Sequence, residues 1–222
     1  MITTLEGIQG SGKSITATAL LHTDFVNLGR KIIANTHLTF PYQHFDLKYF
    51  LDHFEDEELT NCDLWLDEMY QMLDSRTSQA KVNKILTYFV VQTRKRGVDL
   101  YVCTHHIDHI DKRLRRAVDV RGTCNFAEED PCQRCKGTGK KQGDEPADAW
   151  GKPLPKHTCG RCLGAGKQGF ACTTFFNRRA KNRWQRTKRI VVPGSMYWNL
   201  YDTGERIPLT KRQMNISAED IM

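Results

Sequence analysis

The amino-acid sequence predicts an α/β fold in which helices cover both faces of a mostly parallel sheet, with a small cysteine-rich insert. Three observations predict this arrangement. Up to about residue 122, short apolar segments typical of strands alternate with segments of helical periodicity. The glycine-rich sequence GIQGSGKS, residues 7–14, separates the first strand from the first helix. Residues 128–169 are rich in Gly, Pro, Lys and Cys and nearly free of long aliphatic side chains, which predicts an insert outside the sheet.

The expected elements follow one another in strand and helix order. Strands are expected at residues 2–5, 31–36, 62–68, 98–104 and 118–122, and helices at residues 15–28, 46–58 and about 78–96. Gly29 and Gly97 end two of these helices, because glycine readily adopts the left-handed conformation that closes a helix. Residues 170–179 and 189–192 resume strand patterning, and residues 198–203 close the fold. The predicted organisation is a core at residues 1–127, an insert at 128–169, completion of the core at 170–210 and a flexible tail at 211–222.

The composition is that of a cytoplasmic globular protein with a basic surface. Lys and Arg number 33 against 26 Asp and Glu, which gives a net charge of +7 and suits a polyanionic partner. The chain lacks the run of about 20 apolar residues that a membrane helix needs, and residues 1–6 do not resemble a signal peptide. We therefore expect a cytoplasmic protein without membrane insertion. Eight cysteines in that compartment favour a metal site or free thiols over disulfides.

Residues 7–14 fit the phosphate-binding pattern G-x-x-x-x-G-K-[ST] at every fixed position. The glycines let backbone N–H groups point inward around a phosphate, and the helix that follows adds its positive end. Lys13 supplies a mobile charge for the β- and γ-phosphates, and Ser14 is placed to hold Mg²⁺. The predicted nucleotide-binding residues are Gly7, Gly10, Ser11, Gly12, Lys13 and Ser14. The alternative is a Gly/Ser-rich turn with a chance lysine.

Two carboxylates, Asp67 and Glu68, end the apolar strand expected at residues 62–68. Open α/β sheets bind their ligands at the carboxyl ends of the strands, so both side chains are expected beside the nucleotide. There Asp67 would orient Mg²⁺ with Ser14, and Glu68 would polarise the attacking water. Alternatively, the pair only caps a following helix.

Three further residues are candidates for the hydrolytic machinery. His105 directly follows the strand expected at residues 98–104, where a polar side chain could sense the γ-phosphate. A solvated or capping histidine is the alternative. Arg94 and Arg96 close the long helix, where they could complement its dipole or act as arginine fingers on a neighbouring subunit. Arg76 is a weaker candidate for the finger.

The insert contains two copies of C-x-x-C-x-G-x-G. Their four thiols belong to Cys132, Cys135, Cys159 and Cys162, a set that suits one tetrahedral Zn²⁺ site. The copies resemble the cysteine-rich zinc module of DnaJ-type chaperones, which supports zinc rather than chaperone activity. Because the insert lacks an apolar core, zinc is expected to fold it. Contact with DNA, with another subunit or with a capsid protein all remain open for such a zinc ribbon.

A basic stretch with no acidic residue follows the insert. It contains Arg178, Arg179, Lys181, Arg183, Trp184, Arg186, Lys188 and Arg189. The cations could neutralise nucleic-acid phosphates, and the indole could stack on a base or sugar. A solvated hairpin that faces acidic segments such as residues 52–58 is the alternative. Lys112, Arg113, Arg115 and Arg116 form a second basic cluster.

Five short sequences occur in an order that is more specific than any one of them: the phosphate loop, GRKIIAN at 29–35, WLDE at 65–68, RKRGVD at 94–99 and THHID at 104–108. This set resembles the zonula occludens toxin-like ATPases of filamentous phages and, more broadly, the FtsK/HerA class of DNA-pumping ATPases, which includes packaging ATPases of tailless viruses. The resemblance covers about residues 1–122. It implies a RecA-like ASCE core, Mg²⁺-dependent ATP hydrolysis, a ring assembly and work on DNA. Family members commonly carry glutamine at the position of His105.

The sequence therefore predicts an ATP-hydrolysing DNA translocase, a ring-forming viral genome-packaging ATPase with ATP, Mg²⁺ and Zn²⁺ as cofactors. Its DNA could be single- or double-stranded, and a capsid or membrane virion protein could be a partner. Such a protein would act in the host cytoplasm or in association with the virion. Two alternatives remain: a filamentous-phage assembly ATPase, which usually carries a membrane helix not seen in this chain, and a nucleotide-dependent interaction module that docks through its zinc ribbon.

Overall fold

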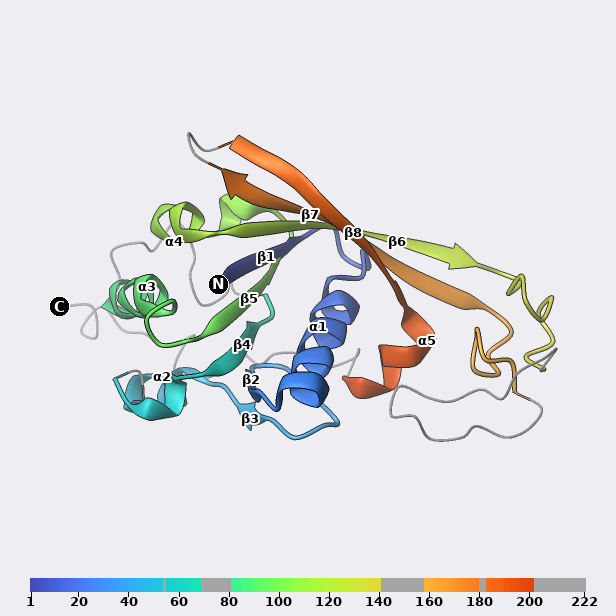
Figure 1. Cartoon of the computed structure of the whole chain (residues 1–222), viewed down its shortest axis with the longest axis horizontal. Helices are drawn as coiled ribbons and strands as arrows, with labels where there is room; N and C mark the ends of the chain where they lie inside the picture. The colour runs from blue at the N-terminus through green and yellow to red at the C-terminus, as the bar shows by residue number, and fades with distance from the viewer. Residues whose placement is uncertain (54, 69–80, 141–157, 180–182, 202–222) are drawn as a thin grey trace, which may run out of the picture.

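A computed structural model describes residues 1–53, 55–68, 81–140, 158–179 and 183–201. These residues form one mixed sheet of eight strands with helices on both faces (Figure 1). The strands are β1 (Ile2–Glu6), β2 (Lys31–Ala34), β3 (Gln43–His44), β4 (Cys62–Leu66), β5 (Asp99–Thr104), β6 (Val120–Glu129), β7 (Gln168–Arg179) and β8 (Arg183–Pro193). The α-helices are α1 (Lys13–Leu28), α2 (Leu47–His53), α3 (Lys81–Gln92), α4 (Lys112–Ala117) and α5 (Gly194–Tyr197).

The strand order is β3-β2-β4-β5-β1-β6-β7-β8. The strands from β3 to β6 all run parallel, whereas β6, β7 and β8 form antiparallel pairs. Strand β5 lies between β1, which leads into the phosphate loop, and β4, which leads into Asp67 and Glu68. This insertion of one strand between the loop strand and the acidic strand gives the predicted RecA-like α/β fold, and the prediction is confirmed.

Each face of the sheet carries its own apolar cluster, because side chains alternate between the faces along every strand. On one face, α1 packs through Ala17 and Leu21 against side chains that include Trp65 of β4. On the other face, α2, α3 and α4 contribute the buried side chains Phe50, Phe89 and Leu114. The two clusters hold the strand ends, and therefore the loops that follow them, in fixed positions.

The sheet extends further than the sequence indicated. Strand β6 continues to Glu129 and β7 begins at Gln168, so the two ends of the predicted insert belong to the sheet. Strand β8 begins at Arg183 rather than residue 189, and ten of its eleven residues are at least partly exposed. One face of these antiparallel strands meets solvent, so many of their residues are polar. The apolar pattern that indicates a strand is therefore weak over these residues.

Two expected helices are shorter than predicted. Residues 46–58 divide into α2 and the 3₁₀-helix Glu57–Leu59. Helix α3 ends at Gln92 rather than residue 96, where the Thr93 hydroxyl donates to the carbonyl of Val90 and residues 93–97 form turns. The expected start of α3, residues 78–80, lies outside the described residues, as do residues 202 and 203 of the closing segment and the tail at 211–222. The closing segment contains the 3₁₀-helix Trp198–Leu200.

Candidate functional site

The phosphate loop leaves the carboxyl end of β1 and turns directly into α1. Gly12 caps the helix in the left-handed conformation, with φ of 86°. Gly7 has φ of 157°, and a Cβ atom there would lie 2.8 Å from the backbone carbonyl oxygen of Cys124, so a side chain at this position would clash with the main chain. The Nζ of Lys13 donates to the carbonyl oxygens of Gly7 and Ile8, both at 2.9 Å. The ammonium group therefore lies across the loop, where the β- and γ-phosphates of a nucleotide would be bound.

Asp67 lies against the start of α1. The hydroxyl of Ser14 donates to Oδ2 of Asp67 at 3.1 Å. Burial raises the pKa of Asp67, although the bond from Ser14 acts in the opposite direction. Asn35 fixes the backbone of Asp67 from the neighbouring strand β2: it accepts from the Asp67 amide at 2.7 Å and donates to the Asp67 carbonyl at 2.9 Å. Two oxygen donors thus face one another, which is the ligand chemistry that Mg²⁺ prefers.

Glu68 follows in a left-handed conformation, with φ of 49°, and its amide donates to Oδ1 of Asp67 at 3.1 Å. His105 comes one residue after Thr104, which pairs with Glu6 at the end of β1. The register therefore places His105 directly after β5, the strand between the phosphate-loop strand and the acidic strand. Its role as a γ-phosphate sensor and the water-polarising role of Glu68 stay predictions.

Arg94 and Arg96 lie at the amino ends of the parallel strands, whereas the phosphate loop lies at their carboxyl ends. The two arginines precede β5, the loop follows β1, and these two strands are parallel. The guanidinium of Arg96 donates to the carbonyl of Asp56 at 3.3 Å and lies 5.7 Å from the ring centroid of Phe89. Neither arginine is placed to reach the nucleotide of its own chain. A finger role therefore requires a neighbouring copy. Arg76 lies outside the described residues.

A pocket of about 230 Å³ opens beside the phosphate loop. Its lining consists of Gly10, Ser11, Gly12, Lys13, Ser14, Ile15, Phe126, Trp198 and Tyr201. The sequence pattern did not indicate a role for the three aromatic residues. Phe126 precedes the predicted insert, and Trp198 and Tyr201 belong to the predicted closing segment. Asn35 was missed in the same way, although it stands in the GRKIIAN segment at the end of β2.

The four cysteines of the two C-x-x-C-x-G-x-G copies converge. All four are buried, and their sulfur atoms lie within 4.8 Å of one another. The sulfur atoms of Cys135 and Cys162 are 3.6 Å apart, far beyond the about 2.05 Å of a disulfide and close to the about 3.8 Å expected for two thiolates on one tetrahedral zinc ion. The geometry fits a single four-thiolate metal site.

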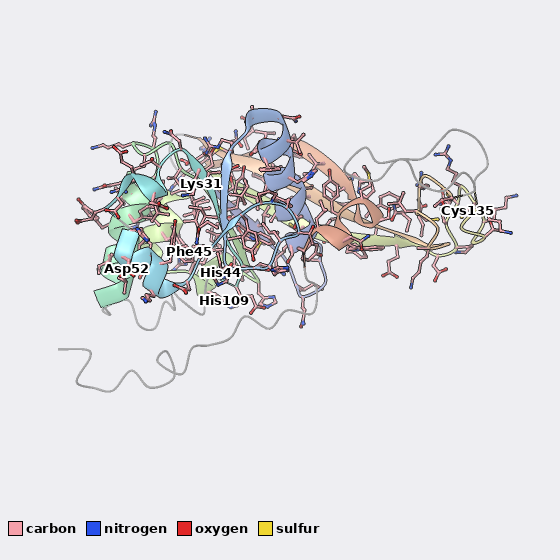
Figure 2. All side chains as sticks on the ribbon, turned by 90° about the horizontal axis from the view of Figure 1, so that it is seen from below. Lys31, His44, Phe45, Asp52, His109 and Cys135 are labelled. Atoms are coloured by element: carbon pink, nitrogen blue, oxygen red, sulfur yellow. The ribbon has the colours of Figure 1, made fainter. Side chains whose placement is uncertain are left out.

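The two cysteine turns are arranged as near copies of one another. The amide of Cys132 donates to the carbonyl of Gly166 at 2.7 Å, and the amide of Cys159 donates to the carbonyl of Gly139 at 2.8 Å. Gly139 has φ of 67°, and a Cβ atom there would lie 2.3 Å from the carbonyl oxygen of Gly164. Each turn therefore closes on the other through its glycines. This cysteine module (residues 130–140 and 158–167) lies at the far end of β6 and β7 (Figures 1 and 2).

The basic stretch forms the end of β7 and most of β8, the edge strand of the sheet. Arg183, Arg186, Lys188 and Arg189 are exposed, whereas the Arg179 side chain and Lys181 lie outside the described residues. Arg178 donates to the carbonyls of Arg116 and Val118, the latter at 3.5 Å. In the second basic cluster, Arg115 forms an ion pair with Asp108, with 2.5 Å between Nη1 and Oδ1.

Trp184 is partly buried rather than displayed. It packs against the cluster under α2, α3 and α4, and the Arg121 guanidinium lies 5.3 Å from its ring centroid. The same guanidinium donates to both carboxylate oxygens of Glu6, each at 2.8 Å. Glu6 directly precedes the phosphate loop. Trp184 of the basic strand is thus linked to the loop through Arg121 and Glu6.

The fold and the phosphate loop define a P-loop ATPase. The chain belongs to the ATPase family associated with various cellular activities (AAA), whose sequence profile matches residues 3–125. It is accordingly an ATP hydrolase. Among the described residues, no helix has the length and apolar character to cross a membrane.

Solved structures are similar to this chain at low sequence identity. The N-terminal domain of zonular occludens toxin from Neisseria meningitidis superposes with a TM-score of 0.56 and 14% identity, over 90% of this chain and 98% of that domain. B204, the DNA-packaging ATPase from Sulfolobus turreted icosahedral virus, has a TM-score of 0.46 and 15% identity, over 85% of this chain and 97% of its own. The likeness to the toxin domain concerns the fold. No curated protein sequence matches the chain.

Proposed function

We propose that this ATPase is a DNA translocase that works as a homo-oligomeric ring, of the viral genome-packaging type. The observation that carries the proposal is the position of the basic edge strand on the sheet that holds the nucleotide. Strand β8 exposes Arg183, Arg186 and Arg189, and its Trp184 contacts Arg121, the partner of Glu6. A polyanion bound along β8 would thus act on side chains linked to the phosphate loop.

The nucleotide-binding roles follow from the contacts described above. Lys13 and the loop amides hold the phosphates, and Ser14 and Asp67 bind Mg²⁺. Mg²⁺, when bound, neutralises charge on the transferring phosphoryl group. Glu68 orients the attacking water, and His105 senses the γ-phosphate from the intervening strand. Arg94 or Arg96 reaches the nucleotide of the next subunit in the ring.

The cysteine module holds one structural Zn²⁺ through Cys132, Cys135, Cys159 and Cys162. A closed four-thiolate site has no open position for a substrate, so the zinc supplies stability rather than catalysis. The domain organisation that we propose is an ATPase core at residues 1–127, a zinc-ribbon insert at 128–169, completion of the core at 170–210 and a tail at 211–222. This assignment makes the module an appendage of the ATPase rather than a part of its active site.

Removing charge from β8 is expected to weaken DNA binding in a salt-dependent way. Each contact to a phosphate of double-stranded DNA releases about 0.9 counterion, so the double variant Arg183→Ala/Arg186→Ala should reduce the slope of log K against log salt by about 2. Fluorescence anisotropy of a labelled duplex over a salt series measures this slope. The matched control is Lys48→Ala/Lys95→Ala, two exposed cations on α2 and after α3. Equal changes in both double variants would contradict a DNA-binding role for β8.

The position of the cysteine module favours a second candidate. Figure 2 places Cys135 at the far end of the molecule from Asp52, on a hairpin that projects from the core. A projecting zinc module suits docking to a capsid or other structural protein. The chain would then be a nucleotide-dependent interaction module with little turnover. Capture of the partner that depends on ATP, without hydrolysis stimulated by DNA, would favour this candidate.

A further inference from the structure

Two aromatic residues, Phe126 and Trp198, line the end of the pocket that lies away from Asp67. A Cβ atom added at Gly169 of β7 would lie 2.2 Å from Cζ of Phe126 and 3.0 Å from Cζ2 of Trp198. Atoms of both rings therefore occupy the space that a side chain at this position would need. A Cβ atom at Gly12 of the phosphate loop would lie 3.5 Å from Cδ2 of Phe126, so the same ring borders the loop. Phe126 therefore lies beside the end of the phosphate loop.

The indole of Trp198 is held from a second side. A Cβ atom at Gly194 of α5 would lie 2.6 Å from Cε2 and 2.9 Å from Nε1 of Trp198. Side chains at Gly169 and Gly194 would displace the ring, and the two glycines leave room for it. Phe126 and Trp198 are nevertheless only partly buried and line the pocket. Aromatic rings that are held in place and line a cavity are suited to a flat ligand group.

The support of this wall is itself buried and hydrogen-bonded. Gln168, 2% exposed, donates to the Ser195 hydroxyl at 2.7 Å and accepts from the Ser195 amide at 3.3 Å. The same Gln168 amide also donates to the carbonyl of Arg161, between the third and fourth cysteines, at 2.5 Å. Ser195 is the second residue of α5, which leads into Trp198. These bonds fix the position of α5 and of the indole relative to β7.

The strand order gives the pocket a direction. Asp67 follows β4 and the phosphate loop follows β1, whereas Phe126 and Gly169 belong to β6 and β7, on the far side of β1 from β4. The order across the sheet is therefore Asp67 and Ser14, then the loop and Lys13, then Phe126 and Trp198. A bound nucleoside triphosphate has the same order of parts: metal and γ-phosphate, then the inner phosphates, then the base.

We propose that Phe126 and Trp198 form the nucleobase site, in which the base stacks on the indole. The inference deepens the nucleotide site proposed above and rests on it. Among the described residues that line the pocket, none has a carboxylate or amide side chain that could read the base edge. Recognition by stacking alone favours the larger ring system, so the site selects purines over pyrimidines and discriminates little between adenine and guanine.

Calorimetric titration of the zinc-loaded protein with Mg²⁺ and four ligands tests this assignment: ADP, GDP, CDP and pyrophosphate. The wild type is expected to bind ADP and GDP about equally and CDP more weakly. Because stacking on one aromatic residue is worth about 1–3 kcal/mol, Trp198→Ala should weaken ADP binding about 5- to 150-fold and leave pyrophosphate binding unchanged. Trp198→Phe should keep most of the affinity, and Lys13→Ala should weaken both ligands.

The outcomes separate the base site from the nucleotide site itself. Equal loss of ADP and pyrophosphate affinity in Trp198→Ala, or no loss of ADP affinity, overturns the base site alone. A wild-type protein that binds neither ligand overturns the nucleotide site as well. Phe126→Leu provides a second variant at the proposed base site, and it should also weaken ADP binding without weakening pyrophosphate binding. Thermal unfolding and zinc content show that each variant is folded.

Discussion

The Glu68→Gln variant is expected to bind Mg²⁺-ATP as tightly as the wild type and to hydrolyse it about 10²- to 10⁴-fold more slowly. Glutamine keeps the size of the side chain and cannot accept a proton from water. Its backbone contact to Asp67 does not depend on the side chain, so the metal site formed by Asp67 and Ser14 should persist. Single-turnover hydrolysis, with nucleotide binding measured in parallel, gives both quantities.

The control for this variant is Glu55→Gln, an exposed carboxylate before the 3₁₀-helix Glu57–Leu59, which should hydrolyse ATP at the wild-type rate. An Asp67→Asn variant should behave differently, because loss of a metal ligand weakens Mg²⁺ binding, and half-maximal hydrolysis should then need a higher Mg²⁺ concentration. Wild-type turnover in Glu68→Gln would move the water-polarising role to another residue. A parallel loss of nucleotide binding would make Glu68 a structural residue of the turn.

Loss of one thiol from the cysteine module is expected to unfold the module and release its metal. Structural zinc sites of this kind carry an apparent binding free energy of about 10–16 kcal/mol, which is folding free energy for a segment without an apolar core. Cys135→Ser should therefore lose the zinc and the exchange protection of residues 130–140 and 158–167. Metal analysis and hydrogen–deuterium exchange measure the two effects.

The matched control for this experiment is Cys172→Ser, a partly buried thiol on β7 that lies outside the cluster. It should keep one zinc ion per chain. Strands β1, β4 and β5 should stay protected from exchange in both variants, because their cores do not include the module. Stoichiometric zinc in Cys135→Ser, or a wild-type protein isolated with disulfides in place of metal, would contradict the assignment.

The sequence predicted those parts of the site whose functional residues are close neighbours along the chain. The phosphate loop is one continuous turn, Asp67 and Glu68 follow their strand directly, and each cysteine pair is separated by two residues. Such features need only correct local folding. The strand alternation also predicted the parallel strands β1, β2, β4 and β5, since a buried parallel strand is a short continuous apolar run. The two-residue parallel strand β3, whose residues are both exposed, was not predicted.

The remaining features depend on contacts between distant residues. Phe126 and Trp198 meet over Gly169 although 72 positions separate them, and no local pattern indicates their convergence. Strands β6 and β8 were underestimated because their many polar side chains face solvent. Trp184 lies in a basic segment, yet it packs beneath Arg121. Only the antiparallel pairing of β6, β7 and β8 brings these residues together.

Steady-state ATP hydrolysis by the zinc-loaded protein, with and without double-stranded DNA at two salt concentrations, tests the proposed translocase most directly. We predict that DNA stimulates turnover, that the stimulation fades at the higher salt concentration, and that Arg183→Ala/Arg186→Ala loses it while keeping basal hydrolysis. Hydrolysis that is indifferent to DNA at both salt concentrations would contradict the translocase and favour the interaction module.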